Sequence, residues 1–449
     1  MATKELTNGS PTKLILYFML PIFFGNIFQQ FYHFIDALIV GRVLGVKALA
    51  AVGSTGALIF FIISFIFSAT QGFTVVTAQK FGARDYDSVR KSLAASIVLS
   101  SVLTLVLTLI SAPFSYQLLA LLRTPSDIID LASTYLFIMF AGIVATVFYN
   151  LSSNVIRALG DSKTPLYFLI FASFLNVFFD LLFILKFNAG IAGAGYATVL
   201  SQAISTILCV TFMFTKFPIL RLKKDDWKIS KAFYMEHLNI GIPMGLQMSV
   251  LSFGIIAMQF VLNSLGSSAI AAYTTGCRVE QLFTQSYVAL GATMAVFSAQ
   301  NFGAKKLSRI KEGAKSAIRI AACISIFAII VLSLFSNQLI ALFMTEIDNQ
   351  IVILASRYLH ITMFSFICLG LLLIYRNILQ GMGNVIAPLS SGAAELIMRT
   401  LCAFIFGHYF GFTGICIATP AAWLSAAIVL YICYKIGIIK NLKKIRQRN

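Results

Sequence analysis

Long runs of apolar residues alternate with short polar connectors along this chain. A helix that crosses a lipid bilayer needs about 20 apolar residues, and twelve runs reach that length. They predict twelve membrane-spanning helices, at roughly 14–40, 45–77, 92–113, 128–155, 164–186, 190–215, 236–262, 271–298, 313–336, 350–378, 388–408 and 412–437. Several runs exceed one crossing, so we expect tilted helices or helices that extend into water.

The second half of the chain repeats the first. Residues 78–84 (AQKFGAR) match residues 299–305 (AQNFGAK), and residues 193–198 (GAGYAT) match residues 414–419 (GICIAT). Six spans per half give both halves the same orientation in the membrane. We therefore predict an all-α integral membrane protein with twelve transmembrane helices in two parallel, pseudosymmetric six-helix lobes. The expected divisions are an N-lobe at 1–215, a basic linker at 216–235 and a C-lobe at 236–449 that ends in a basic tail.

Charge decides the orientation of these spans. Only 11% of the residues are charged and 59% are hydrophobic, whereas soluble domains carry about 25% charged residues. A net charge of +18 would suggest a nucleic-acid partner in a soluble chain. Here 27 lysines and arginines lie on the side of the membrane that holds both ends of the chain, and six lie on the other. Basic residues favour the cytoplasm, so we predict cytoplasmic termini and no nucleic-acid partner.

The chain carries no sign of a cleaved leader or of a cysteine framework. The first apolar run, 14–40, is longer than the core of a signal peptide, so we expect it to stay as the first span. The seven cysteines form no C-x-x-C pair and mostly lie in apolar runs. We therefore expect free thiols rather than disulfides or a cysteine metal site.

Acidic residues inside the predicted spans are few, which makes them informative. A carboxylate at membrane depth costs about 2.5–3.5 kcal/mol unless a partner, a proton or water compensates it. Four acids lie in spans: Asp36, Asp180, Glu280 and Glu395. Each of them therefore needs an explanation in terms of pairing or function.

Two of these acids come to the same depth. Asp36 and Asp180 each lie six residues, or about 9 Å, before the outer end of their spans. Thr198 lies about 12 Å from the outer end of a span that begins on the outside. Asn176 shares a helix face with Asp180. The four side chains predict a cation site, either a proton shared between two carboxylates or a sodium ion held by oxygen ligands. We expect no other cofactor.

The repeat offers a control for this site. Met258 aligns with Asp36 and Ala403 aligns with Asp180, so the second half lacks both carboxylates. Acids that only supported the fold would be expected in both halves, which favours a functional role. The alternative is that the two acids satisfy buried backbone donors or pair with a base.

The remaining candidates are weaker. Glu395 and Arg399 are four residues apart, a spacing that favours a structural ion pair. Glu280 lies near Arg278 and fits a substrate contact or a local pair equally well. Pro21 lies about seven residues into the first span and favours a kink there. Polar and flexible side chains that could line a substrate cavity are Gln30, His33, Met244, Gln247, Met248, Met258 and Glu280.

Several of these motifs together resemble the multidrug and toxic compound extrusion family. They are the paired Q-x-x-G-A connectors, residues 157–165 (RALGDSKTP), and N-x-x-x-D at 176–180 followed by G-x-x-x-A-T ending at Thr198. The resemblance covers essentially the whole chain. It implies a secondary antiporter that exports small organic cationic drugs in exchange for sodium or protons by alternating access.

The resemblance also assigns roles to residues. It implies an N-lobe cation site at Asp36, Asn176, Asp180 and Thr198, a hinge at Pro21, and a monomer surrounded by lipid in the cytoplasmic (inner) membrane. One branch of the family places essential acids on the seventh and tenth helices. This chain has only Glu236 at the edge of the seventh and none in 351–378, so a C-lobe cation site is not expected.

Three other functions compete with export of drugs. A flippase for lipid-linked oligosaccharides could use the same two-lobed layout, but one for anionic lipids should line its cleft with bases, and only Arg399 is expected deep in a span. The chain lacks the motifs of an intramembrane or ATP-driven enzyme, since H-E-x-x-H, G-x-S-x-G and G-x-x-x-x-G-K-[ST] are all missing. A structural or receptor role would leave the one-sided carboxylates unexplained.

Overall fold

The computed structural model describes residues 5–344 and 348–446, with the side chains of 33, 252, 255 and 438–446 left out. The first half contains α1 (Pro11–Leu44), α2 (Val46–Gly82), α3 (Tyr86–Ser111), α4 (Ser115–Leu121), α5 (Ile129–Ala141), α6 (Ile143–Ala158), α7 (Lys163–Leu181) with a π-helical turn η1 (Leu182–Lys186), and α8 (Gly190–Lys216). The linker holds two short 3-10 turns, η2 (Pro218–Leu220) and η3 (Lys224–Trp227). The second half contains α9 (Lys231–Asn263), α10 (Ser267–Gly303), α11 (Leu307–Ala341), α12 (Asn349–Thr362), η4 (Met363–Ser365), α13 (Phe366–Gly381), α14 (Ile386–Phe410) and α15 (Phe412–Arg446).

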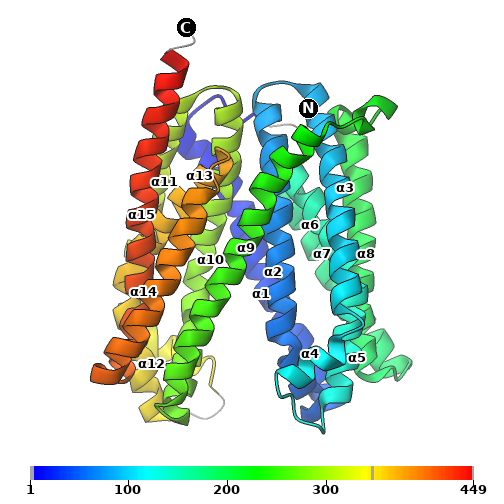
Figure 1. The fold of residues 1–449 in the computed structure, drawn as a ribbon. Helices are drawn as coiled ribbons and strands as arrows, with labels where there is room; N and C mark the ends of the chain where they lie inside the picture. Colours follow the sequence, from blue (N-terminus) through cyan, green and yellow to red (C-terminus); the bar gives the residue numbers. More distant parts are fainter. Residues whose placement is uncertain (1–4, 345–347, 447–449) are drawn as a thin grey trace. The chain divides into compact units, whose positions relative to one another are not determined.

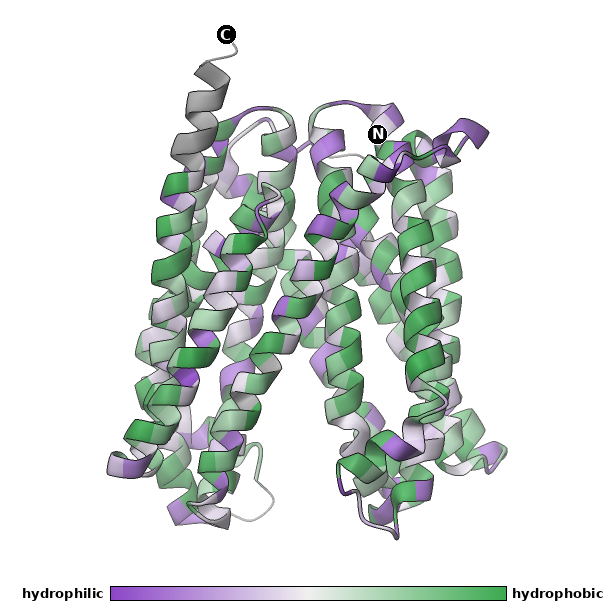
Figure 2. Ribbon diagram, in the orientation of Figure 1, coloured by the Kyte–Doolittle hydropathy of each residue, from purple (hydrophilic) through white to green (hydrophobic). Residues whose placement is uncertain are grey.

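These helices confirm the all-α membrane fold. Among the described residues, eleven helices or helix pairs are long and apolar enough to cross a membrane, and the number is twelve if α5 and α6, which meet at a 45° bend, are counted as one span. Some helices extend beyond the predicted spans, such as α2, which ends at Gly82 rather than 77, whereas α8 agrees with its predicted span to within one residue. Figure 2 shows the reason for both results, because hydrophobic residues dominate the middle of the helices and hydrophilic residues gather at their ends and connectors.

The internal repeat is visible in the backbone. Gly45 precedes α2 with φ 87° and Gly266 precedes α10 with φ 89°. Arg84 follows α2 with φ 60° and Lys305 follows α10 with φ 58°. Both pairs are 221 positions apart, and a positive φ is uncommon for residues other than glycine. The matching conformations indicate that the two halves use the same turns.

The chain divides into two compact units whose limits differ from the expected lobes. Unit 1 contains Glu5 and residues 24–245, and unit 2 contains residues 6–23 and those from 246 onward. The first part of α1 therefore groups with the C-terminal helices, and the first part of α9 groups with the N-terminal ones (Figure 1). α1 passes from unit 2 to unit 1 after Phe23, two residues beyond Pro21. α9 passes from unit 1 to unit 2 after Gly245, two residues beyond Pro243.

The Q-x-x-G-A connector of unit 2 binds the segment that leads into α1. The Leu6 N–H donates to Gln300 Oε1 at 2.8 Å, and Asn301 Nδ2 donates to the Leu6 carbonyl at 3.2 Å. Arg309 Nη1 donates to the Gly9 carbonyl at 3.0 Å. These bonds hold the start of α1 on unit 2, which gives the repeated connector a structural role.

The start of α9 is held on unit 1 in a comparable place. Arg90 Nε lies 3.1 Å from Asp226 Oδ2, and Ser92 Oγ lies 2.8 Å from the ring nitrogen Nε2 of buried His237. Further along, Gly72 and Gly241 bring α2 and α9 so close that a Cβ on Gly72 would lie 2.5 Å from the Gly241 Cα. Only glycine permits such an approach of two helix backbones.

Candidate cation site

Unit 1 brings together the four residues of the predicted cation site. Asp36 comes from α1, Asn176 and Asp180 from α7, and Thr198 from α8. Asn176 and Asp180 are completely buried. Three helices therefore deliver oxygen-bearing side chains to one place inside a membrane-spanning unit.

Asn176 links Thr198 to Asp180 through hydrogen bonds. With its amide oriented to suit its neighbours, Asn176 donates to Asp180 Oδ2 at 2.9 Å. Its carbonyl oxygen accepts from the Thr198 backbone N–H at 3.2 Å and from the Thr198 hydroxyl at 3.3 Å. The amide thus fixes the rotamer of Asp180 and leaves the other carboxylate oxygen available.

The two carboxyl groups face each other, and no base lies between them among the described side chains. Asp36 and Asp180 lie within hydrogen-bonding range of one another. The Oδ1 atom of each is buried and has no hydrogen-bond partner among the described residues. Two carboxylates in contact repel unless a proton or a cation lies between them, and buried polar atoms are rarely left unpaired. The geometry therefore suits a shared proton or a bound cation.

Two tyrosines complete the site and were not predicted as members. Tyr32, one turn before Asp36 on α1, lies within hydrogen-bonding range of the Thr198 side chain. Tyr135 of α5 is buried and close enough to both carboxyl groups to interact with them electrostatically. The spacing of Tyr32 and Asp36 could have indicated the first. Nothing in the sequence near Tyr135 points to Asp36 or Asp180.

Local backbone irregularity marks the end of α7. Asp180 lies in its last turn, and the helix continues directly into the π-helical turn η1. Such turns widen a helix by one residue and are frequent at functional sites. Here the irregularity begins two residues after Asp180, next to the candidate site.

The corresponding place in unit 2 has different chemistry. Met258 stands where the repeat places Asp36, and its sulfur accepts from the Tyr273 hydroxyl at 3.6 Å and the Thr419 hydroxyl at 4.0 Å. Arg399 stands where the repeat places Asn176, and Ala403 replaces Asp180. The aligned position in unit 2 therefore offers a thioether and a methyl group in place of the two carboxylates, and a guanidinium in place of the Asn176 amide.

The expected pair of Glu395 and Arg399 is present, but it has a third member. Glu395 Oε1 lies 2.9 Å from Arg399 Nη2, and Glu395 Oε2 lies 3.0 Å from Arg376 Nη2. The expectation that Arg399 is the sole deep base was wrong, because Arg376 is only 4% exposed and lies inside α13. Arg376 lies near the end of the predicted span 350–378, where a base is expected to reach water.

Glu280 has a partner other than the expected one. The Tyr358 hydroxyl donates to Glu280 Oε2, and the same hydroxyl accepts from the Cys277 thiol at 3.4 Å. Among the described residues Glu280 forms no ion pair with Arg278. Its carboxyl group is buried behind aromatic rings, since Tyr273 packs edge-on against Tyr358 with ring centroids 5.0 Å apart.

The weaker cavity candidates are divided between the units. Gln30 is exposed and Met244 is buried in unit 1, whereas Met248, Met258 and Glu280 belong to unit 2. Gln247, also in unit 2, bonds the Pro388 carbonyl and the Gln380 side chain, so it ties α9 to α13 and α14. The side chain of His33 lies outside the described residues. A shared substrate cavity for these residues stays a prediction.

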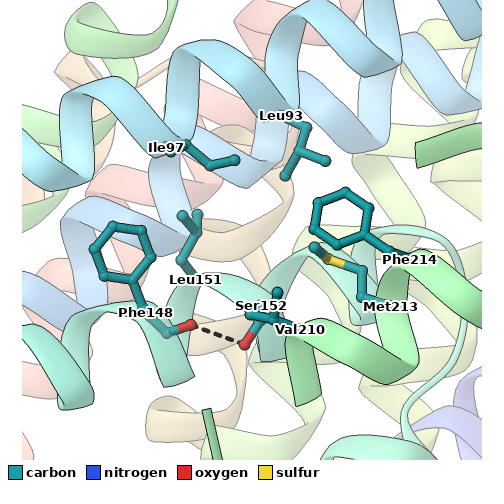
Figure 3. A pocket seen from close by; sticks show the side chains of 8 residues that line it. All are labelled: Leu93, Ile97, Phe148, Leu151, Ser152, Val210, Met213 and Phe214. Atoms are coloured by element: carbon teal, nitrogen blue, oxygen red, sulfur yellow. Dashed lines mark hydrogen bonds between the residues drawn. The ribbon is translucent and has the colours of Figure 1, made fainter. Parts of the chain in front are cut away.

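Unit 1 also contains a small apolar cavity of about 140 Å³ between α3, α6 and α8 (Figure 3). Its lining residues are Leu93, Ile97, Phe148, Leu151, Ser152, Val210, Met213 and Phe214. The Ser152 hydroxyl, the polar side-chain group of this lining, donates to the Phe148 carbonyl at 2.8 Å. This cavity therefore presents apolar surface rather than ligands for an ion.

Comparison with known proteins connects both halves to one family. The family model MatE matches residues 21–182 and again residues 243–405. Each match covers most of the helices of one half, with Pro21 and Pro243 at the first matched positions. The same model thus recognises both halves, in agreement with the internal repeat.

Individual relatives match over nearly their whole length. The chain is 31% identical over 448 residues to the probable multidrug resistance protein YpnP of Bacillus subtilis, covering 99% of both chains. It is 24% identical over 428 residues to the multidrug export protein MepA of Staphylococcus aureus, covering 94% of this chain and 93% of MepA. A crystal structure of MATE in complex with MaL6 superposes with a TM-score of 0.88 at 25% identity, covering 98% of this chain and 99% of that one.

Proposed function

Because the chain belongs to the multidrug and toxic compound extrusion family, we propose that it is a secondary antiporter that exports organic cations in exchange for sodium ions or protons. The observation that carries the coupling is the pair Asp36 and Asp180, two carboxyl groups in contact with an unpartnered buried oxygen on each. An antiporter needs a buried site that gains and loses a cation in each cycle, and this pair has the required chemistry.

The side chains around the pair have complementary roles in this proposal. Asn176 and Thr198 hold Asp180 in place and add neutral oxygen ligands that suit a sodium ion. If the coupling ion is a proton, the two carboxyl groups share it and Tyr32 and Tyr135 exclude water. No further cofactor is required, because the ion gradient supplies the free energy.

The proposal extends to the setting of the protein. The distribution of basic residues supports cytoplasmic termini in the cytoplasmic (inner) membrane. Two units joined by α1 and α9 suit alternating access, in which one unit rocks against the other around fixed sites. We assign the protein as a monomer surrounded by lipid, since each unit buries its own ion-pair and hydrogen-bond networks.

Transport in proteoliposomes tests the coupling directly. Purified protein would be reconstituted, and export of a fluorescent organic cation would be followed under a sodium gradient and under a proton gradient imposed separately. Wild type would be compared with Asp36→Asn and Asp180→Asn at equal protein levels. Glu312→Gln is the matched control, because Glu312 is an exposed acid on α11. We expect one gradient to drive export by wild type and by the control, with loss of coupling in both aspartate variants.

The outcomes separate the parts of the proposal. Dye binding that persists in the aspartate variants while gradient-driven export stops supports an ion site distinct from the dye site. Export that continues at the wild-type rate in both variants would show that these carboxyl groups do not couple transport. A wild type that ignores both gradients would remove the antiporter, and lipid translocation would become the activity to measure.

A further inference from the structure

Unit 2 buries two arginines against a single carboxylate. Arg376 of α13 and Arg399 of α14 each donate one N–H to Glu395, and the side chains of the three residues are 5%, 11% and 7% exposed. A charged group at membrane depth requires compensation. One carboxylate neutralises one guanidinium, so this trio carries one positive charge in excess.

One donor of the trio is also unsatisfied. A guanidinium presents a fork of several N–H groups, yet within the described residues each arginine bonds a protein acceptor through a single nitrogen. Arg376 Nε is buried and has no partner among the side chains and backbone groups that the structure describes. Buried donors of this kind are almost always paired, so the site lacks an acceptor as well as a negative charge.

The nearest further acid lies toward Arg399 and leaves Arg376 uncompensated. Glu280 interacts with Arg399 electrostatically and accepts a hydrogen bond from the Tyr358 hydroxyl, and in the described part of the chain it forms no ion pair with either arginine. The Gln380 and Gln247 amides next to Arg376 bond one another at 3.0 Å. Negative charge and hydrogen-bond acceptors are therefore both missing beside Arg376.

We infer that Arg376 and Arg399 form a binding site for an oxyanion, a carboxylate or phosphate group carried by the transported molecule. The inference rests on the proposed function and narrows its substrate class from organic cations to molecules that carry an anionic group as well. Arginine forks match the planar, paired oxygens of such groups. Glu395 keeps the two forks apart and oriented while the site is empty.

The position of the site supports a role in transport. Arg399 occupies the place that Asn176 holds in the cation site of unit 1, and a Cβ on Gly254 of α9 would lie 3.4 Å from its Cδ. The two units thus carry opposite charge preferences at aligned positions. A zwitterionic molecule would find its anionic group matched in unit 2 without competing for the carboxyl groups of unit 1.

A matched pair of dyes tests the inference. Rhodamine B carries a carboxylate beside its delocalised cation, and its ethyl ester carries the cation alone. Binding of both would be measured by fluorescence polarisation with purified protein in an uncharged detergent, for wild type, Arg376→Gln and Arg376→Lys. The control is Arg357→Gln, at an exposed arginine of unit 2. Thermal unfolding of each variant would run in parallel.

We expect wild type to prefer rhodamine B, and Arg376→Gln to weaken that dye about tenfold or more, as for loss of one charge-assisted hydrogen bond. Affinity for the ester should stay unchanged, which also reports that the variant is folded. Arg376→Lys should recover part of the preference. Equal affinity of wild type for acid and ester, or an equal loss of both in Arg376→Gln, would overturn the inference.

A competitor distinguishes the two sources of the oxyanion. Dihexanoyl phosphatidylglycerol would be added to wild type with bound rhodamine B. Displacement assigns the site to lipid phosphate, and retention alongside the acid preference assigns it to the carboxylate of a small molecule. Gradient-driven export of the ester reports the proposed function separately, so an exporter without acid preference would refute the anion site alone.

Discussion

Gly142, at the bend between α5 and α6, lies directly against the side chain of Val199 on α8. A Cβ at Gly142 would overlap both Cγ atoms of Val199. Val199 follows Thr198 in the chain, so this contact sets the distance between the bent helix and the backbone that bonds Asn176. The bend and the cation site are therefore parts of one arrangement.

Gly142→Ala should destabilise unit 1 and disturb the site. The added methyl group must push α8 away, and such overpacking costs about 1–3 kcal/mol. We expect a lower midpoint of thermal unfolding in detergent and weaker affinity for the coupling ion. Gly53→Ala is the control, because nothing lies within 4 Å of a Cβ there and alanine favours a helix. Equal midpoints for the two variants would contradict the contact.

The sequence predicted the helices and four of the six residues that gather at the candidate cation site. Apolar runs predict membrane crossings because a residue in lipid must be apolar or paired. The number of residues from each helix end predicted the same depth for Asp36 and Asp180. The bend at Gly142 was missed, and its contact with Val199 was hidden because that residue lies on a helix far along the chain. Tyr135 was missed for the same reason, because its carboxyl neighbours come from α1 and α7.

Charge counting failed at one position. It assigns a base near the end of an apolar run to water, and Arg376 lies five residues before the end of α13. The residue turns inward because Glu395 on α14 attracts it, and no periodicity within α13 reveals that partner. The sequence also did not predict that α1 and α9 each belong partly to one unit and partly to the other. This division depends on which connectors, distant in the sequence, bind the first residues of these two helices.

Thr198→Val should weaken the site more than Thr198→Ser. Valine removes the hydroxyl that donates to Asn176 and keeps the shape and the backbone N–H, whereas serine keeps the hydroxyl. Loss of one hydrogen bond in a network around charged groups costs about 1.5 kcal/mol. We expect roughly a tenfold increase in the ion concentration that gives half-maximal export for valine, and little change for serine. The same increase for both would assign the effect to packing.

The docking of the linker on unit 1 should depend on Arg90. Its partner Asp226 has a side chain that is 5% exposed, and Arg90 itself is 12% exposed. Arg90→Ala leaves that buried carboxylate without its cation, a change that costs about 3 kcal/mol or more. Lys228→Ala breaks the pair with Asp225, whose members are 81% and 82% exposed, and should cost little. Thermal unfolding and protease cleavage of the linker measure both, and a stable Arg90→Ala variant would contradict the docking.

The crossings of α1 and α9 make Pro21 and Pro243 candidates for paired hinges. Each proline lacks an N–H and lies at the point where its helix leaves one unit for the other. Pro21→Ala and Pro243→Ala should each stiffen one crossing and slow the exchange between states. We expect export to fall roughly tenfold, equivalent to about 1.4 kcal/mol in the barrier, while affinity for the coupling ion is retained. Pro420→Ala is the matched control, since Pro420 lies inside α15 within unit 2. Its export should equal that of wild type. A similar decrease in all three variants would indicate a general effect of proline on the helices rather than hinges at the crossings.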